Sequence, residues 1–130
     1  MAGEKTVLVV GGGISGITAA VEAAEAGCKV ILVEKLPYLG GRVARMNKYF
    51  PKLCPPTCGL EINYKRIKKN SDITVYTLAS VGNVTGSPGS YTATIKIMPR
   101  HIEDHSGTSK CVEDCPVEIP NEFNYGMDMT

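Results

Sequence analysis

The sequence predicts an α/β fold with a parallel sheet, and three observations near its start support this. Residues 7–10 form an apolar run rich in β-branched side chains, which is the composition of a strand buried on both faces. Residues 17–24 carry apolar side chains at helical spacing, and Gly27 stands where a helix ends in a left-handed residue. Residues 29–33 form a second apolar run. A strand, a helix and a strand in this order predict a βαβ unit with parallel strands.

A glycine-rich loop joins the first strand to the helix and fits G-x-G-x-x-G, with glycines at positions 11, 13 and 16. In a dinucleotide-binding turn, Gly11 permits the tight turn, Gly13 lets a pyrophosphate approach the backbone, and Gly16 lets the helix pack closely on the sheet. The helix N-terminus offers unpaired N–H groups and partial positive charge to the phosphates. Glu34 ends the second strand, where a carboxylate accepts from a ribose hydroxyl and repels a 2′-phosphate. The sequence therefore predicts a Rossmann-like dinucleotide site.

Other interpretations of residues 7–34 explain fewer of their features. A signal-peptide core or a membrane span needs an uninterrupted apolar segment, but Glu4 precedes the run, the glycines interrupt it and Glu22 charges its far end. A sheet whose glycines serve packing alone remains an alternative, but it leaves Glu34 unexplained. We therefore favour nucleotide binding.

Length, charge and cysteine content narrow the class of protein. The 130 residues suffice for one modest domain with its own core. The net charge of +1 argues against a general nucleic-acid role, and no window is long and apolar enough for direct membrane insertion. Five cysteines without a secretory signal indicate a reducing compartment, which predicts a cytoplasmic protein. The basic residues at 65–69 form either a solvated face or a docking surface for a partner protein.

The middle of the chain predicts two further elements of the α/β unit. Residues 43–50 predict a helix or an irregular segment. A helix with one apolar side follows Cys58 and ends at Asn70. Residues 73–76 predict a third strand.

The last third of the chain is less regular. Residues 80–97 predict a β-hairpin with its turn at 86–89, although residues 79–84 are also compatible with an extension of the edge of the parallel layer. We therefore expect two parts: an incomplete Rossmann-like domain over residues 1–100, and an irregular, cysteine-containing segment over residues 101–130.

A second glycine pair, Gly40-Gly41, lies six residues beyond Glu34 and is followed by Arg42. It gives a second place where backbone can approach a ligand closely. This E-x-x-x-x-x-G-G spacing resembles FAD-binding Rossmann proteins more than nicotinamide dehydrogenases. The resemblance favours FAD over NAD and implies that Gly41 and Arg42 lie near the pyrophosphate or ribityl side. The alternative is that the pair forms only a turn.

Four of the five cysteines form two pairs with the same i, i+4 spacing: Cys54 with Cys58, and Cys111 with Cys115. The second pair, followed by proline, matches the end of the bacterial ferredoxin run, but the two earlier cysteines of that run are absent. Together the pairs supply the four thiolates that a [4Fe-4S] cluster needs. Tetrathiolate zinc, a reducible disulfide and plain buried thiols remain open as alternatives.

Several of these features together resemble one family. They are the glycine loop, Glu34, the segment 40–42, the segment 50–58 and the run CPVEIPNEFNYGM at 115–127. The chain resembles the A subunit of heterodisulfide reductase, and most closely its relative in the quinone-interacting membrane-bound oxidoreductase of sulfate reducers. The resemblance covers essentially the whole chain, and its last run is the most specific part.

The resemblance implies a soluble, FAD-containing electron-transfer subunit that works with other electron-transfer subunits carrying iron–sulfur centres. It implies that the cysteines carry a cluster beside the flavin. Family members are several times longer, so we expect this chain to be an N-terminal piece of a longer subunit or to be completed by a partner chain. The residues that it implies around FAD are Gly11, Gly13, Ser15, Gly16, Glu34, Lys35, Gly41 and Arg42, with backbone near Val81 at the adenine.

Three functional hypotheses follow from the sequence. The first is an electron-transfer flavoprotein module that passes electrons between flavin and iron–sulfur centres, because no residue looks like a general base or a nucleophile. The second is an NAD-binding dehydrogenase module, which has no use for Gly40-Gly41 or the cysteines. The third is a non-enzymatic, nucleotide-stabilised assembly subunit.

Overall fold

The computed structural model describes residues 5–100, 116–120 and 127. The chain divides into two compact units, Met1–Met98 and Pro99–Thr130. All the helices and strands of the described residues belong to the first unit. The following account concerns that unit.

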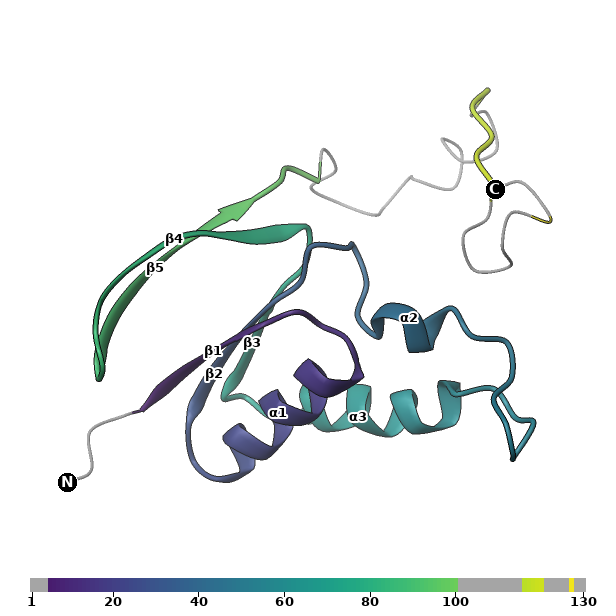
Figure 1. Ribbon diagram of the computed structural model, residues 1–130, viewed down its shortest axis with the longest axis horizontal. Coiled ribbons are helices and arrows are strands. Elements are labelled where there is room, and N and C mark those ends of the chain that lie inside the picture. Colours follow the sequence, from purple (N-terminus) through teal and green to yellow (C-terminus); the bar gives the residue numbers. More distant parts are fainter. Residues whose placement is uncertain (1–4, 101–115, 121–126, 128–130) are drawn as a thin grey trace. The chain divides into compact units, whose positions relative to one another are not determined.

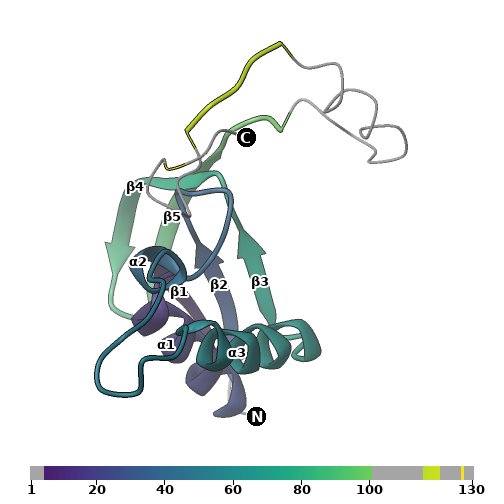
Figure 2. The same ribbon diagram turned by 90° about the vertical axis from the view of Figure 1, so that its right-hand side faces the viewer.

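A three-stranded parallel sheet forms the centre of the unit (Figures 1 and 2). Its strands are β1 (Thr6–Val10), β2 (Lys29–Val33) and β3 (Ile73–Tyr76), in the order β1-β2-β3. The helices α1 (Ile14–Glu25) and α3 (Thr57–Lys69) lie against the same face of this sheet. The predicted α/β fold with a βαβ start is therefore confirmed.

The core lies between α1 and the two strands β2 and β3. One side of α1, containing Ile17, Ala20, Val21 and Ala24, is buried, as its helical spacing predicts. This side packs on the buried side chains of β2 and β3, which are Val30, Leu32 and Ile73. Because β2 has a neighbour on each side, it is the most completely buried strand.

The predicted burial of the first strand on both faces is wrong for the described sheet. The three central residues of β1 are half-buried, and the Val10 side chain is 65% exposed. The reason is position: β1 is an edge strand, hydrogen-bonded to β2 alone among the described residues. An apolar composition typical of a central strand therefore stands at an open edge.

The ends of the helices agree with the sequence signals. Gly27 has a φ of +87° and its N–H donates to the Ala24 oxygen at 2.9 Å, which is the left-handed helix end expected there. The helix α3 stops before Asn70, as predicted. Residues 43–50 are mostly irregular: the short helix α2 covers only Gly41–Ala44.

The hairpin is also confirmed, with one correction. The strands β4 (Ala79–Ser87) and β5 (Ser90–Ile97) are antiparallel, and they lie on the side of the sheet away from α1 and α3 (Figure 1). Residues 79–84 do not extend the parallel layer, because β4 pairs only with β5 within the described part of the chain. Leu78, with a φ of +52°, turns the chain out of the sheet directly before β4.

An ion-pair cluster joins the two long helices at the surface. The Arg66 guanidinium of α3 donates to the Glu25 carboxylate at 2.7 Å and to Glu22 at 3.1 Å, both on α1. The hydrogen bond from Arg66 lowers the pKa of Glu25. Part of the basic group at 65–69 is therefore used within the fold, between two helices that share a core face. The helices within the described ranges are all too short or too polar to cross a membrane.

Candidate functional site

The two glycine segments of the sequence meet in space. The Gly40 N–H donates to the Gly12 oxygen at 2.7 Å, and Gly13 and Gly40 form an isolated parallel bridge. A Cβ on Gly41 would lie 3.2 Å from the Gly13 Cα. The loop after β1 and the loop after β2 thus form one site at the carboxyl ends of two neighbouring parallel strands, where α/β sheets bind ligands.

The glycines of the first loop differ in what surrounds them. Gly11 has a φ of +103°, which allows the turn out of β1. A Cβ on Gly16 would lie 1.9 Å from the Gly11 oxygen, so only glycine lets the helix begin this close to the turn. A Cβ on Gly13 would meet no described atom within 4 Å. The backbone at Gly13 therefore faces open space, as a phosphate cradle requires.

The N-terminus of α1 points into this site without a cap of its own. Gly13 is the N-cap residue, no side chain caps the helix, and no acidic residue lies in its first turn. The first intrahelical hydrogen bond runs from the Ile17 N–H to the Gly13 oxygen at 2.9 Å. The N–H groups of the first turn, including that of Ser15, have no partner within the helix and favour an anion.

Glu34 lies between the two loops and is 8% exposed. Its Oε2 accepts from the Gly12 N–H at 2.5 Å, and its Oε1 accepts from the Leu36 N–H at 2.8 Å. The carboxylate thus points into the site and braces both loops. Each carboxylate oxygen has a second lone pair that these two hydrogen bonds do not use.

Sequence analysis missed this bracing role, although one signal for it exists. Gly12 occupies a variable position of the G-x-G-x-x-G pattern, so the pattern assigns it no task. A Cβ on Gly12 would lie 2.4 Å from a Leu39 methyl carbon and 3.0 Å from the Glu34 Oε2. The middle glycine of the three consecutive ones is therefore what allows the carboxylate to approach the loop.

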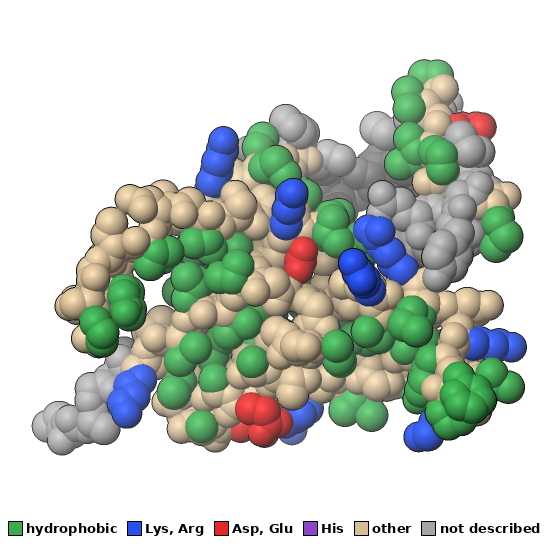
Figure 3. Space-filling view, in the orientation of Figure 1, with side chains coloured by type: hydrophobic (Ala, Val, Ile, Leu, Met, Phe, Trp, Pro, Cys, Tyr) green, Lys and Arg blue, Asp and Glu red, His purple; other side chains and the backbone are tan. Residues whose placement is uncertain are grey.

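Three predicted FAD residues remain: Lys35 in the loop after β2, Arg42 in α2, and Val81 in β4 (Ala79–Ser87). Lys35 directly follows Glu34 and is exposed, and Arg42 is an exposed residue of α2. Val81 lies in β4, opposite Ile95 of β5. On the face shown in Figure 3, basic side chains stand on both sides of an acidic one near the middle. Positive charge of this kind favours an anionic ligand.

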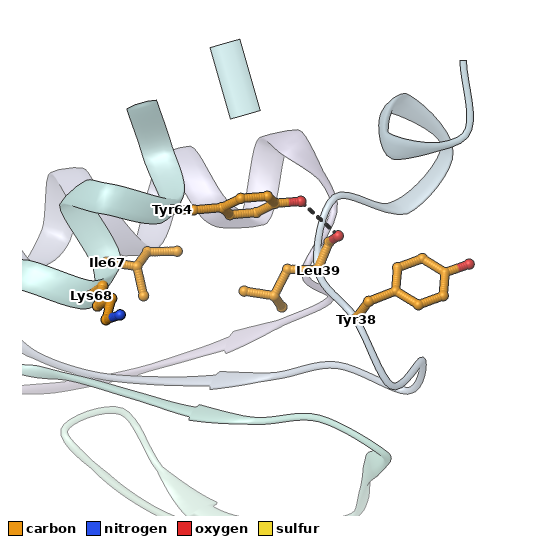
Figure 4. Close-up of a pocket in the computed structure, with 5 residues that line it drawn as sticks. All are labelled: Tyr38, Leu39, Tyr64, Ile67 and Lys68. Carbon is orange, nitrogen blue, oxygen red and sulfur yellow. Dashed lines mark hydrogen bonds between the residues drawn. The ribbon is translucent and has the colours of Figure 1, made fainter. Parts of the chain in front are cut away.

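An apolar cavity of about 330 Å³ lies beside the second loop, and sequence analysis did not predict it (Figure 4). Its lining residues are Tyr38, Leu39, Tyr64, Ile67 and Lys68. The Tyr64 hydroxyl donates to the Leu39 oxygen at 2.8 Å, and burial raises the pKa of Tyr64. This hydrogen bond ties α3 to the residue before Gly40 and so helps to position the second glycine pair.

The first cysteine pair lies in a loop and at the start of a helix. Cys54 is half-buried, Cys58 is exposed in the first turn of α3, and both are free thiols. Tyr49 and Cys54 pair through the backbone as an isolated antiparallel bridge, and the interaction with the Cys54 side chain raises the pKa of Tyr49. Within the described ranges, no three histidine, cysteine or acidic residues are grouped as metal ligands. Cys111 and Cys115 lie outside those ranges.

Comparisons with known proteins show the family of the chain. The family model for FAD dependent oxidoreductases matches residues 6–70, which is half of the chain. The chain is 43% identical over 124 residues to an iron-sulfur A subunit of the CoB–CoM heterodisulfide reductase of Methanopyrus kandleri, covering 94% of this chain and 19% of that protein. It is 38% identical over 129 residues to the corresponding iron-sulfur protein of Methanocaldococcus jannaschii, covering 95% and 19%. The chain thus spans about a fifth of the length of these relatives.

Solved structures support the fold. Thioredoxin reductase of T. acidophilum superposes with a TM-score of 0.55 at 21% identity, covering 71% of this chain and 31% of that one. The resemblance to the A subunit of heterodisulfide reductase is confirmed by the curated relatives, and FAD is the cofactor named for the matching family. The chain therefore belongs to the FAD dependent oxidoreductase family.

Proposed function

We propose that this chain binds the ADP portion of FAD as part of an electron-transfer subunit in a heterodisulfide-reductase-like complex. The observation that carries the proposal is the meeting of both glycine loops and the Glu34 carboxylate at the carboxyl ends of β1 and β2. The open backbone at Gly13 and the uncapped N-terminus of α1 fit a pyrophosphate. Glu34 fits the adenosine ribose beside them.

Each of the other candidate residues has a role in the same proposal. Ser15 contributes from the first turn of α1, while Lys35 and Arg42 supply positive charge to the phosphates. Gly41 lets the second loop approach the ligand, and backbone near Val81 contacts the adenine. Bound FAD accepts electrons in pairs and releases them singly to one-electron centres. The chain's own residues bind and orient it.

The cysteines extend the proposal to an iron–sulfur centre. Cys54 and Cys58 are free thiols four residues apart, one in the loop before α3 and one in its first turn, so they fit two neighbouring thiolate ligands. We assign them to a [4Fe-4S] cluster, together with Cys111 and Cys115. The two curated relatives are themselves named as iron-sulfur subunits. Other redox subunits are the expected partners, in a cytoplasmic complex.

Titration with FAD tests the nucleotide assignment. Protein purified without oxygen and incubated with FAD is expected to retain it at about one per chain, with a flavin absorption band at about 450 nm. NADH and the 2′-phosphorylated NADPH serve as competitors, and neither is expected to displace the flavin. Tight NADH binding without flavin retention would overturn the assignment in favour of an NAD-binding module.

Cysteine substitution tests the cluster. In Cys54→Ser, iron and acid-labile sulfide are expected to fall from about four per chain to near zero, because a hydroxyl replaces a thiolate ligand. Cys28→Ser is the matched control: Cys28 is a half-buried thiol next to β2, and its loss should leave iron unchanged. Full iron content in Cys54→Ser would refute the ligand assignment.

A further inference from the structure

We propose that Tyr64 is a positioning residue: it holds the loop after β2, which contains Gly40 and Gly41, in place and thereby gives the site a preference for FAD over smaller adenine nucleotides. This inference rests on the proposed function, in which that loop approaches FAD beyond its adenosine. No binding motif in the sequence includes Tyr64. Its role follows from a hydrogen bond across the fold and from the different surroundings of the two glycines.

The two glycines of the loop after β2 meet different parts of the protein. A Cβ on Gly41 would lie 3.2 Å from the Gly13 Cα, so Gly41 faces the loop after β1. A Cβ on Gly40 would lie 2.6 Å from the Tyr64 hydroxyl oxygen and 3.4 Å from a Leu60 methyl carbon, both on α3. Gly40 is itself buried. Tyr64 therefore acts on the loop through Gly40, from the side of α3, while Gly41 faces the space proposed for the ligand.

A single peptide group of this loop is held at both ends. Its oxygen belongs to Leu39 and accepts a hydrogen bond from the Tyr64 hydroxyl at 2.8 Å (Figure 4). Its N–H belongs to Gly40 and donates to the Gly12 oxygen at 2.7 Å. Because a peptide group is planar, with its oxygen and its N–H pointing in opposite directions, fixing the oxygen also fixes the direction of the N–H. Tyr64 therefore helps to aim the contact that joins the two glycine loops.

The helix α3 presents the Tyr64 hydroxyl from a fixed position. Ile67 of this helix packs against the core, and Arg66 pairs with Glu25 of α1 at 2.7 Å. The N-terminus of α1 in turn follows directly from the loop after β1. Tyr64 thus ties the loop after β2 to the same framework that carries the loop after β1.

Loss of the hydroxyl has different consequences for a long and a short ligand. In the proposed site, AMP depends on Glu34 and on the loop after β1, whereas FAD also extends along the loop after β2. A loop that is held less firmly has to be ordered by the ligand, which weakens binding. We therefore expect the Kd for FAD to rise about tenfold, as the free energy of one hydrogen bond implies, and the Kd for AMP to change by less than about twofold.

The test is Tyr64→Phe, which removes the hydroxyl and keeps the ring. Titration calorimetry measures the Kd for FAD and for AMP, and nuclear magnetic resonance measures amide hydrogen exchange at Gly40 in the protein without nucleotide. We expect weaker FAD binding, unchanged AMP binding and faster exchange at Gly40.

Two control variants separate this effect from a general loss of stability. Tyr91→Phe makes the same chemical change in β5, where Tyr91 is 64% exposed, and should leave all three measurements unchanged. Ile67→Val trims another side chain of α3 that lines the same cavity as Tyr64. It should lower the melting temperature without changing the ratio of the two Kd values.

Three other results for Tyr64→Phe would overturn the inference. Equal weakening of FAD and AMP binding would show that the hydroxyl supports the whole unit. Unchanged FAD affinity would show that the loop does not need it. Weaker FAD binding with unchanged exchange at Gly40 would show that Tyr64 acts on the ligand itself and not through the loop. If the wild-type protein did not retain FAD, the proposed function would fail as well, and the wild-type titration detects this before any variant is compared.

Discussion

Gly13→Val is expected to fold like the wild-type protein and to bind FAD about 100-fold more weakly or worse. The backbone at Gly13 is extended, with φ −72° and ψ 177°, which valine adopts readily. A Cβ there meets no described protein atom within 4 Å, so the side chain should occupy the open space proposed for the pyrophosphate. A 100-fold loss of affinity corresponds to about 2.7 kcal/mol of binding free energy. Fluorescence titration with FAD and thermal unfolding of the apoprotein measure the two effects.

Gly16→Ala is the matched control, because its added Cβ would meet the protein backbone and not open space. Its Cβ would lie 1.9 Å from the Gly11 oxygen, so α1 must move away from the turn. We expect a loss of about 3 kcal/mol in the free energy of unfolding without any ligand present. If Gly13→Val lost as much stability as Gly16→Ala, Gly13 would be a packing position. If Gly13→Val kept its FAD affinity, the phosphate would lie elsewhere.

Glu34→Ala is expected to destabilise the protein even in the absence of nucleotide. The carboxylate accepts hydrogen bonds from the N–H groups of Gly12 and Leu36, and Gly12 is buried. Without the carboxylate, both donors lose their partner, and hydrogen bonds to a charged group contribute about 1.5–3 kcal/mol each. We expect a loss of about 3 kcal/mol, measured by urea unfolding of the apoprotein, together with a loss of FAD binding.

Two further variants separate the bracing role of Glu34 from ribose binding. Glu34→Gln keeps the shape, but its amide offers one oxygen to two N–H donors, so its stability should fall between those of wild type and Glu34→Ala. Lys35→Ala changes the adjacent exposed residue and should leave unfolding unchanged. Unchanged stability in Glu34→Ala, with FAD binding lost, would show that the carboxylate serves the ligand alone.

The parts of the fold that the sequence predicts are those with a local signal. Apolar periodicity located α1 and α3, Gly27 located the end of α1, and the hairpin was anticipated from its strand-like runs and its glycines. The exposure of β1 was not predictable, because it depends on which neighbours a strand has and not on its composition.

In the candidate site, too, the residues with a local sequence signal were predicted, and the contacts that depend on the folded chain were not. The glycine pattern and Glu34 were found because their spacing is characteristic. The hydrogen bonds of Glu34 to Gly12 and Leu36 were missed, because the pattern treats Gly12 as variable and Leu36 donates through its backbone. The backbone pairing of Tyr49 with Cys54 was also missed. It includes Leu53 in the left-handed region, a conformation that is not predictable from a leucine in the sequence.

The open edge of β1 affects how the protein should be handled. In the described sheet, one hydrogen-bonding edge of this valine-rich strand pairs with no neighbour, and Val10 is well exposed. Such an edge is a template for pairing with another molecule of the same kind, which leads to oligomers and precipitates. The dispersity of a preparation therefore has to be measured, for example by light scattering across a dilution series, before any flavin stoichiometry is calculated from it.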